Sequence, residues 1–160
     1  MAALHFKKLI AFTTLLLAVS GVSAQVLDRK TLSLEAAQKI IAGAVAEAKA
    51  NNWLVNIAIV DEGGNLLSFQ RMDGALIGSV DVSIGKARTS ALFRRPTRVL
   101  EEAAKTRPAI VTLPNGVLLQ GGLPIVSNGQ TVGAIGVSGV TSQQDEQIAE
   151  AGIRHAGFSQ

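Results

Sequence analysis

The spacing of apolar and polar residues changes several times along the chain, and each spacing predicts an element. From residue 34 to 50, apolar side chains recur every three or four positions, which predicts a helix capped by Ser33. Alternation from Val55 to Met72, broken at Glu62-Gly63-Gly64-Asn65, predicts an antiparallel hairpin. The apolar face of the predicted helix comprises Leu34, Ala37, Ile41, Ala44, Val45 and Ala48.

Helical spacing returns between Gly78 and Phe93, and a short helix is predicted between Pro96 and Pro108. Residues 109–122 contain prolines and glycines that favour an irregular loop or a weak strand. Alternating residues on both sides of Asn128-Gly129-Gln130 predict a second hairpin, with strands at 123–127 and 131–138.

A last helix is predicted to begin near Thr141 or Ser142, where Ser142 and Asp145 have the spacing of a capping box. The order is therefore helix, hairpin, two helices, hairpin, helix. This order is typical of an α+β domain with an antiparallel sheet covered by helices, and it argues against a Rossmann-type fold.

The first residues have the composition of a secretory signal peptide. Lys7 and Lys8 precede an apolar run at residues 9–19, and small residues lead to a cleavage position after Ala24. The apolar run is about half of the ~20 residues that span a bilayer, so a retained anchor is the weaker interpretation. We therefore expect residues 1–24 to be removed, residues 25–160 to form one domain without a membrane span, and the protein to be periplasmic or secreted.

Composition narrows the classes of function. Without the predicted signal peptide the chain has 13 basic and 12 acidic residues and no basic block, which gives no basis for binding nucleic acid. The absence of cysteine excludes disulfides, iron–sulfur clusters, thiolate zinc sites and a cysteine nucleophile. No triad, HExxH motif or phosphate loop is present, so we do not assign catalytic residues and lean against an enzyme.

Polar residues form a second stripe on the helix predicted at 78–93. Ser79, Ser83, Lys86 and Ser90 follow one another at helical spacing, so that small hydroxyls surround one cation. Such a stripe predicts a surface for a carboxylate, such as that of a small organic acid. The alternative is an ordinary solvated helix face.

The end of the first hairpin and a set of glycines supply further candidates. Arg71, Met72 and Asp73 precede Gly74, and Asp-Gly is typical of turns. Arg71 and Asp73 are interpreted either as an ion pair or helix cap, or as contacts to a ligand or subunit. Gly121 and Gly122 favour close helix packing or a bulge, or alternatively one wall of a pocket or an oligomer contact.

Four separated motifs occur in an order that resembles a known family: AIVDEGGNLLSFQRMDGA, GKARTSAL, GGLPIVSNGQTVGAIGVSG and DEQIAEAG. Together they resemble the GlcG/HbpS-like haem-binding family, which is related to the C-terminal domain of PduO-type proteins, over about residues 32–152. The resemblance implies a profilin-like fold with a five-stranded antiparallel sheet between helices. It also implies homo-oligomers and, in some members, binding of haem or a corrinoid-related ligand.

Iron ligands are scarce for a haem protein. Once the predicted signal peptide is removed, His155 and Met72 are the sole histidine and methionine, and the chain has no tyrosine or cysteine. His155 is a weak candidate, and haem would be held by its propionates and apolar face or ligated by a hydroxyl or water. The open alternatives are a small organic acid ligand and an oligomeric accessory module for a sensor or exported enzyme.

Overall fold

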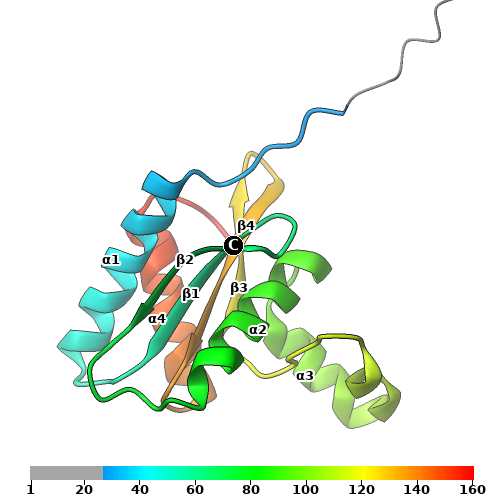
Figure 1. Cartoon of the computed structure of the whole chain (residues 1–160). Coiled ribbons are helices and arrows are strands. Elements are labelled where there is room, and N and C mark those ends of the chain that lie inside the picture. Colours follow the sequence, from blue (N-terminus) through cyan, green and yellow to red (C-terminus); the bar gives the residue numbers. More distant parts are fainter. Residues whose placement is uncertain (1–26) are drawn as a thin grey trace, which may run out of the picture.

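A four-stranded antiparallel sheet forms the centre of the molecule (Figure 1). The computed structural model describes residues 27–160, so the predicted signal peptide lies outside the described residues. The strands are arranged in the order β2-β1-β4-β3. Their bounds are Asn56–Asp61 for β1, Leu66–Arg71 for β2, Gly122–Ser127 for β3 and Gln130–Ser138 for β4.

The five-stranded sheet implied by the resemblance is wrong for residues 27–160, which form four strands. The segment considered as a weak strand instead begins with the 3₁₀ helix η1 (Pro108–Thr112) and continues as a loop. Its backbone amides bond to side chains: Val117 N donates to Thr89 Oγ1 at 2.8 Å and Gln120 N to Glu101 Oε2 at 2.7 Å. The alternative of an irregular loop is thus confirmed, because these donors are used outside any strand ladder.

Both predicted hairpins are confirmed. In the first, Asn56 lies opposite Arg71 in the β1–β2 register. Asp61 Oδ1 closes its turn by accepting the backbone N–H groups of Gly63 at 2.9 Å and Asn65 at 2.8 Å. In the second, residues 128 and 129 both have positive φ, as a two-residue hairpin turn between twisted strands favours.

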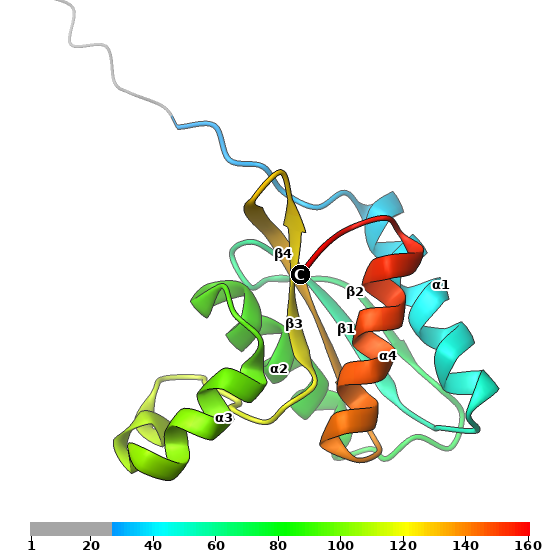
Figure 2. The same ribbon diagram turned by 180° about the vertical axis from the view of Figure 1, so that it is seen from behind.

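Helices cover both faces of the sheet. Helices α1 (Leu34–Ala50) and α4 (Ser142–His155) pack together on one face, and α2 (Ser79–Phe93) lies on the other (Figures 1 and 2). Helix α3 (Thr97–Thr106) lies beside α2 and buries little of its surface. None of the helices in residues 27–160 has the length and hydropathy to cross a membrane.

The two faces of the sheet are packed differently. The main core lies beneath α1 and α4 and contains large aliphatic side chains, among them Ile40, Ile57, Ile59, Ile125, Ile135 and Ile148. The α2 face is lined mainly by alanines, including Ala58, Ala87, Ala91 and Ala134. Small side chains let α2 approach the sheet so closely that a Cβ on Gly136 would overlap the carbonyl oxygen of Ser83.

The helix starts confirm one predicted cap and correct another. Ser33 caps α1 as predicted, because its Oγ accepts the Ala36 N–H at 3.2 Å. The capping box of α4 is formed by Thr141 and Gln144, so the box predicted at Ser142 and Asp145 is wrong. Asp145 is unavailable for that role because its carboxylate is turned into the interior.

Candidate functional site

The corner that follows β2 holds Arg71, Met72 and Asp73, three of the predicted ligand-binding residues. The N–H of Met72 donates to the carbonyl of Val55 at 3.1 Å, which fixes the end of the hairpin. Gly74 has a φ of 81°, a value that favours glycine. The turn that Asp-Gly predicts is therefore confirmed.

Arg71 and Asp73 are both exposed. They form no ion pair with each other among the described residues, and α2 begins without a side-chain cap. The predicted ion pair and helix cap are therefore wrong. The Arg71 guanidinium is left at the surface, where it can meet an anion, and its role in binding a ligand stays a prediction.

Exposed apolar side chains lie around the same corner. Leu54, Leu76 and Ile77 have 46%, 64% and 78% of their surface exposed, which is unusual for large aliphatic residues so close together. The loop that carries Leu76 is tied to β1 because Asn56 Nδ2 donates to the Leu76 carbonyl at 2.9 Å. Asn56 is in turn the register partner of Arg71.

These relationships bring an arginine and an apolar surface together. Asn56 points to the α2 side of the sheet, because its side chain bonds to the loop before α2. Residues opposite each other in an antiparallel pair point to the same face, so Arg71 also lies on the α2 side. Leu54 adjoins the turn, since its Cδ1 lies 3.1 Å from where a Cβ on Gly74 would be. We call Leu54, Arg71, Leu76 and Ile77 the corner patch.

Lys86 is buried rather than exposed on the polar stripe. Its Nζ lies 2.8 Å from Asp145 Oδ2 and 2.9 Å from the carbonyl oxygen of Val137. The two charged side chains are only 2% and 3% exposed. This buried ion pair joins α2 to α4. A ligand would reach this ammonium only if the ion pair opened, and a ligand role for Lys86 stays a prediction.

The environment of Asp145 raises the pKa of its carboxyl above the ordinary value. Burial is the main cause, because it penalises the charged form. The positive charge of Lys86 and the backbone N–H of Val140, which donates to Asp145 Oδ1 at 3.2 Å, act in the opposite direction but only in part. The ion pair with Lys86 therefore offsets only part of the cost of removing the Asp145 carboxylate from water.

The other hydroxyls of the stripe have structural partners. Ser83 Oγ donates to the Val80 carbonyl at 2.8 Å, and Ser90 Oγ donates to the Arg95 carbonyl at 2.9 Å. Both serines are buried against the sheet. The interpretation as a solvated helix face is therefore wrong from Ser83 to Ser90, and a ligand role for these buried hydroxyls stays a prediction.

Gly121 and Gly122 bring the chain close to the ion pair and to α2. Gly121 has a φ of 118°, and a Cβ there would lie 2.8 Å from Asp145 Cβ and 3.0 Å from Lys86 Nζ. A Cβ on Gly122 would meet the Lys86 carbonyl oxygen. Close helix packing, one of the interpretations of these glycines, is confirmed.

Neither iron-ligand candidate belongs to a cluster. His155 is exposed in the last turn of α4, against Gly43 of α1, and α4 ends at the opposite end of the sheet from the corner patch (Figure 1). Met72 is half-buried and packs against the main core. Residues 27–160 contain no group of three or more His, Cys, Asp or Glu side chains able to hold a metal ion.

Two residues of this region were missed from the sequence. The spacing of Asp145 from Ser142 predicted a helix cap. Its true partner, Lys86, lies 59 positions earlier, and nothing in the local sequence indicates that pairing. Asn56 was treated as an ordinary strand residue. A polar side chain at the start of an otherwise apolar strand was the available signal, because a buried amide needs partners.

The fold and motif order define a small α+β domain of a known class. The model of the family described as "Haem degrading protein HbpS-like" matches residues 32–154. The chain belongs to this family, as the resemblance indicated. Protein GlcG of Escherichia coli strain K12 is 48% identical over 108 residues, which cover 67% of this chain and 81% of GlcG.

Solved structures agree with the family assignment. A double mutant of HbpS from Streptomyces reticuli superimposes with a TM-score of 0.78 at 35% identity, covering 86% of this chain and 97% of that protein. A PduOC:Heme complex gives a TM-score of 0.75 at 25% identity and covers 81% and 97% of the two chains. The fold is thus shared with HbpS and with a protein whose structure was solved as a heme complex.

Proposed function

We propose that this protein binds haem, or a related tetrapyrrole, at the corner patch. The observation that carries the proposal is the juxtaposition of Arg71 with exposed Leu54, Leu76 and Ile77. A porphyrin has a flat apolar face and two carboxylates at one edge, which requires an apolar surface beside a cation. The family and the haem complex of a structural relative support the same ligand.

The residues present suit the porphyrin better than they suit the iron. Leu76 and Ile77 would cover the ring and Arg71 would pair with a propionate. Met72 is the corner's one side chain of a usual axial type among the described residues, and it is already packed on the core. Recognition should therefore depend on the ring and its carboxylates, with the iron ligated weakly or by a hydroxyl or water.

This proposal is tested by titrating haemin into the mature protein, residues 25–160, and following the Soret band. The variant Arg71→Gln should weaken binding about tenfold, because it removes one charge-assisted bond to a propionate. Arg107→Gln, an exposed arginine away from the corner, is the matched control and should bind like wild type. Equal binding by Arg71→Gln and wild type would contradict the assignment.

Iron-free protoporphyrin IX separates recognition of the ring from ligation of the metal. Comparable affinity for protoporphyrin and haemin would support recognition through the apolar face and the propionates. A large preference for haemin, lost in Met72→Leu, would instead identify Met72 as an iron ligand and contradict the weak ligation proposed above.

We further propose that the protein is exported and works as a homo-oligomer. Support for export is the Lys7-Lys8 and apolar leader, and support for assembly is the exposure of Val99, Val111 and Leu119 around α3 and η1. N-terminal sequencing of the exported protein should begin at Gln25. Light scattering should give a multiple of the subunit mass, and a monomer at micromolar concentration would contradict assembly.

A further inference from the structure

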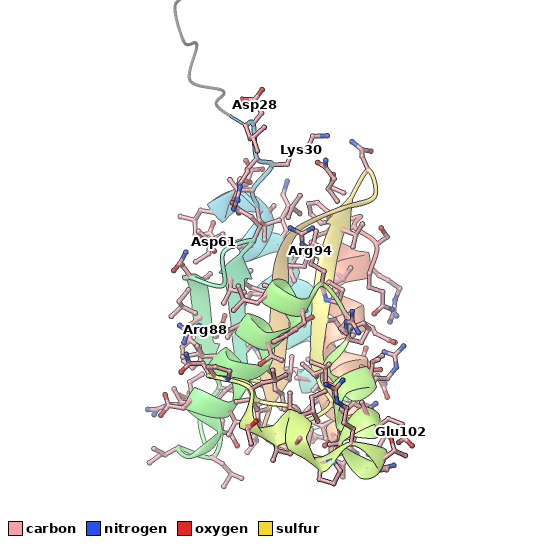
Figure 3. The ribbon with its side chains drawn as sticks, turned by 90° about the vertical axis from the view of Figure 1, so that its right-hand side faces the viewer. Asp28, Lys30, Asp61, Arg88, Arg94 and Glu102 are labelled. Carbon is pink, nitrogen blue, oxygen red and sulfur yellow. The ribbon has the colours of Figure 1, made fainter. Side chains whose placement is uncertain are left out.

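A hollow lies at the far end of α2 from the corner patch. It has a volume of about 650 Å³ and is bounded by the end of α2, the β3–β4 hairpin and the extended residues before α1. Figure 3 shows this end of the molecule, with Asp28, Lys30 and Arg94 labelled. Its size lies within the range of about 300–1,000 Å³ that is common for small-molecule sites.

Positive charge predominates around this hollow, which we call the basic cavity. Arg29, Lys30, Arg94 and Arg95 line it, against two side-chain carboxylates, Asp28 and Glu62, and beside the last residue, Gln160. None of the six charged side chains forms an ion pair within 4 Å in the part of the chain that the structure describes. The cations are therefore not neutralised by these side chains and create a positive potential that attracts an anion.

The two adjacent arginines are held in place by α2. The Arg94 N–H donates to the Ser90 carbonyl, and the Ser90 hydroxyl donates to the Arg95 carbonyl at 2.9 Å. Arg94 adopts a left-handed conformation, with φ 52° and ψ 43°, which is unfavourable for a residue with a Cβ. Ser90 thus fixes the backbone from which both arginine side chains extend.

Glu62 indicates that a ligand with a hydrogen-bond donor, as well as negative charge, would be favoured here. One of its carboxylate oxygens, Oε2, is buried and has no hydrogen-bond partner among the described residues. A buried carboxylate oxygen without a donor is costly, so a ligand donor that reached it would be favoured. The basic cavity therefore offers cations for a carboxylate and an acceptor for a hydroxyl.

From this combination we propose that the basic cavity binds a small hydroxycarboxylate, independently of haem. The ligand carboxylates pair with Arg94 and Arg95, with Arg29 and Lys30 closing the site from the segment before α1. The ligand hydroxyl donates to Oε2 after the Glu62 side chain turns toward the cavity, because this oxygen has no exposed surface in the structure. Because α2 separates this cavity from the corner patch, both ligands can be bound together.

The test uses calorimetric titration of the mature protein with malate, and with succinate, which lacks the hydroxyl, at about 0.15 M salt to screen nonspecific attraction. We expect saturable malate binding and weaker succinate binding. Arg94→Gln and Arg95→Gln should each lower the affinity for malate about tenfold, since each removes a charge-assisted bond. Glu62→Ala should remove the preference for malate over succinate.

Controls separate the site from general effects of charge and folding. Lys39→Gln/Lys105→Gln removes two exposed cations elsewhere and should bind malate normally. Arg29→Gln/Lys30→Gln also removes two positive charges, from an exposed extended segment outside the core. This variant should lower the affinity for malate without changing the thermal midpoint of unfolding. No saturable malate binding by ~10 mM, equal affinities for malate and succinate, or unchanged binding in the cavity variants would each overturn the proposal.

Discussion

Lys86 Nζ lies 2.8 Å from Asp145 Oδ2, and the pair is buried between a helix on one face of the sheet and a helix on the other. Lys86 also bonds to the Val137 carbonyl of β4, so the ammonium joins three elements. Buried ion pairs seldom add much net stability, but removing one partner strands the other charge. The pair therefore links the position of α2 to that of α4 and β4.

The first prediction concerns removal of one partner. Lys86→Met should lower the free energy of unfolding by about 3–5 kcal/mol near neutral pH, because Asp145 would be buried without a counter-charge. Urea denaturation of the mature protein measures this loss. The double variant Lys86→Met/Asp145→Leu should be more stable than Lys86→Met alone, and additive losses would contradict a direct coupling.

The second prediction concerns pH. Because burial raises the pKa of Asp145, the native state holds this proton more tightly than the unfolded chain does. Its contribution to stability is therefore fully present below the unfolded value near 4 and is lost as pH rises through the native pKa. In Lys86→Met the loss should be larger, since the main opposing charge is gone.

The difference in unfolding free energy between wild type and Asp145→Asn isolates this group from other carboxyls. Urea denaturation at pH values from about 4 to 7 should show this difference becoming less favourable to wild type as pH rises. An increase over the same range would mean that the pKa of Asp145 is lowered and that pairing outweighs burial.

The third prediction concerns the close approach at Gly121. Gly121→Ala places a methyl group 2.8 Å from Asp145 Cβ at a φ of 118°, so it should destabilise the fold by ~3 kcal/mol or more. Gly129→Ala is the matched control. It also has positive φ, but nothing lies within 4 Å, and it should cost ~1 kcal/mol. Similar thermal midpoints for the two variants would contradict tight packing over the ion pair.

The local patterns predicted the elements well. Alternation, glycine-rich turns and capping residues are properties of neighbouring residues, so both hairpins and the Ser33 cap could be identified directly. The strand count came from the family resemblance and was wrong for the described residues. Prolines and side-chain partners such as Thr89 divert the segment before β3 from the sheet.

The site was harder to predict because it depends on contacts distant in sequence. Helical spacing put Lys86 correctly on one stripe with Ser83 and Ser90, but it could not show which face of α2 meets the sheet. Small residues such as Ala87 and Gly136 allow that polar face to be buried as well. The apolar residues of the corner patch differ from expectation in the opposite direction. Leucine and isoleucine are expected to be buried, but here they are exposed.

The central claim is that the corner patch receives a porphyrin, and its apolar half gives the most direct test. Haemin should be titrated into wild type and Leu76→Ser/Ile77→Ser, with Leu27→Ser as an equally exposed aliphatic control. We predict a saturable Soret shift for wild type and the control, and binding weakened at least about tenfold in the double variant. Identical curves for all three proteins would contradict the account.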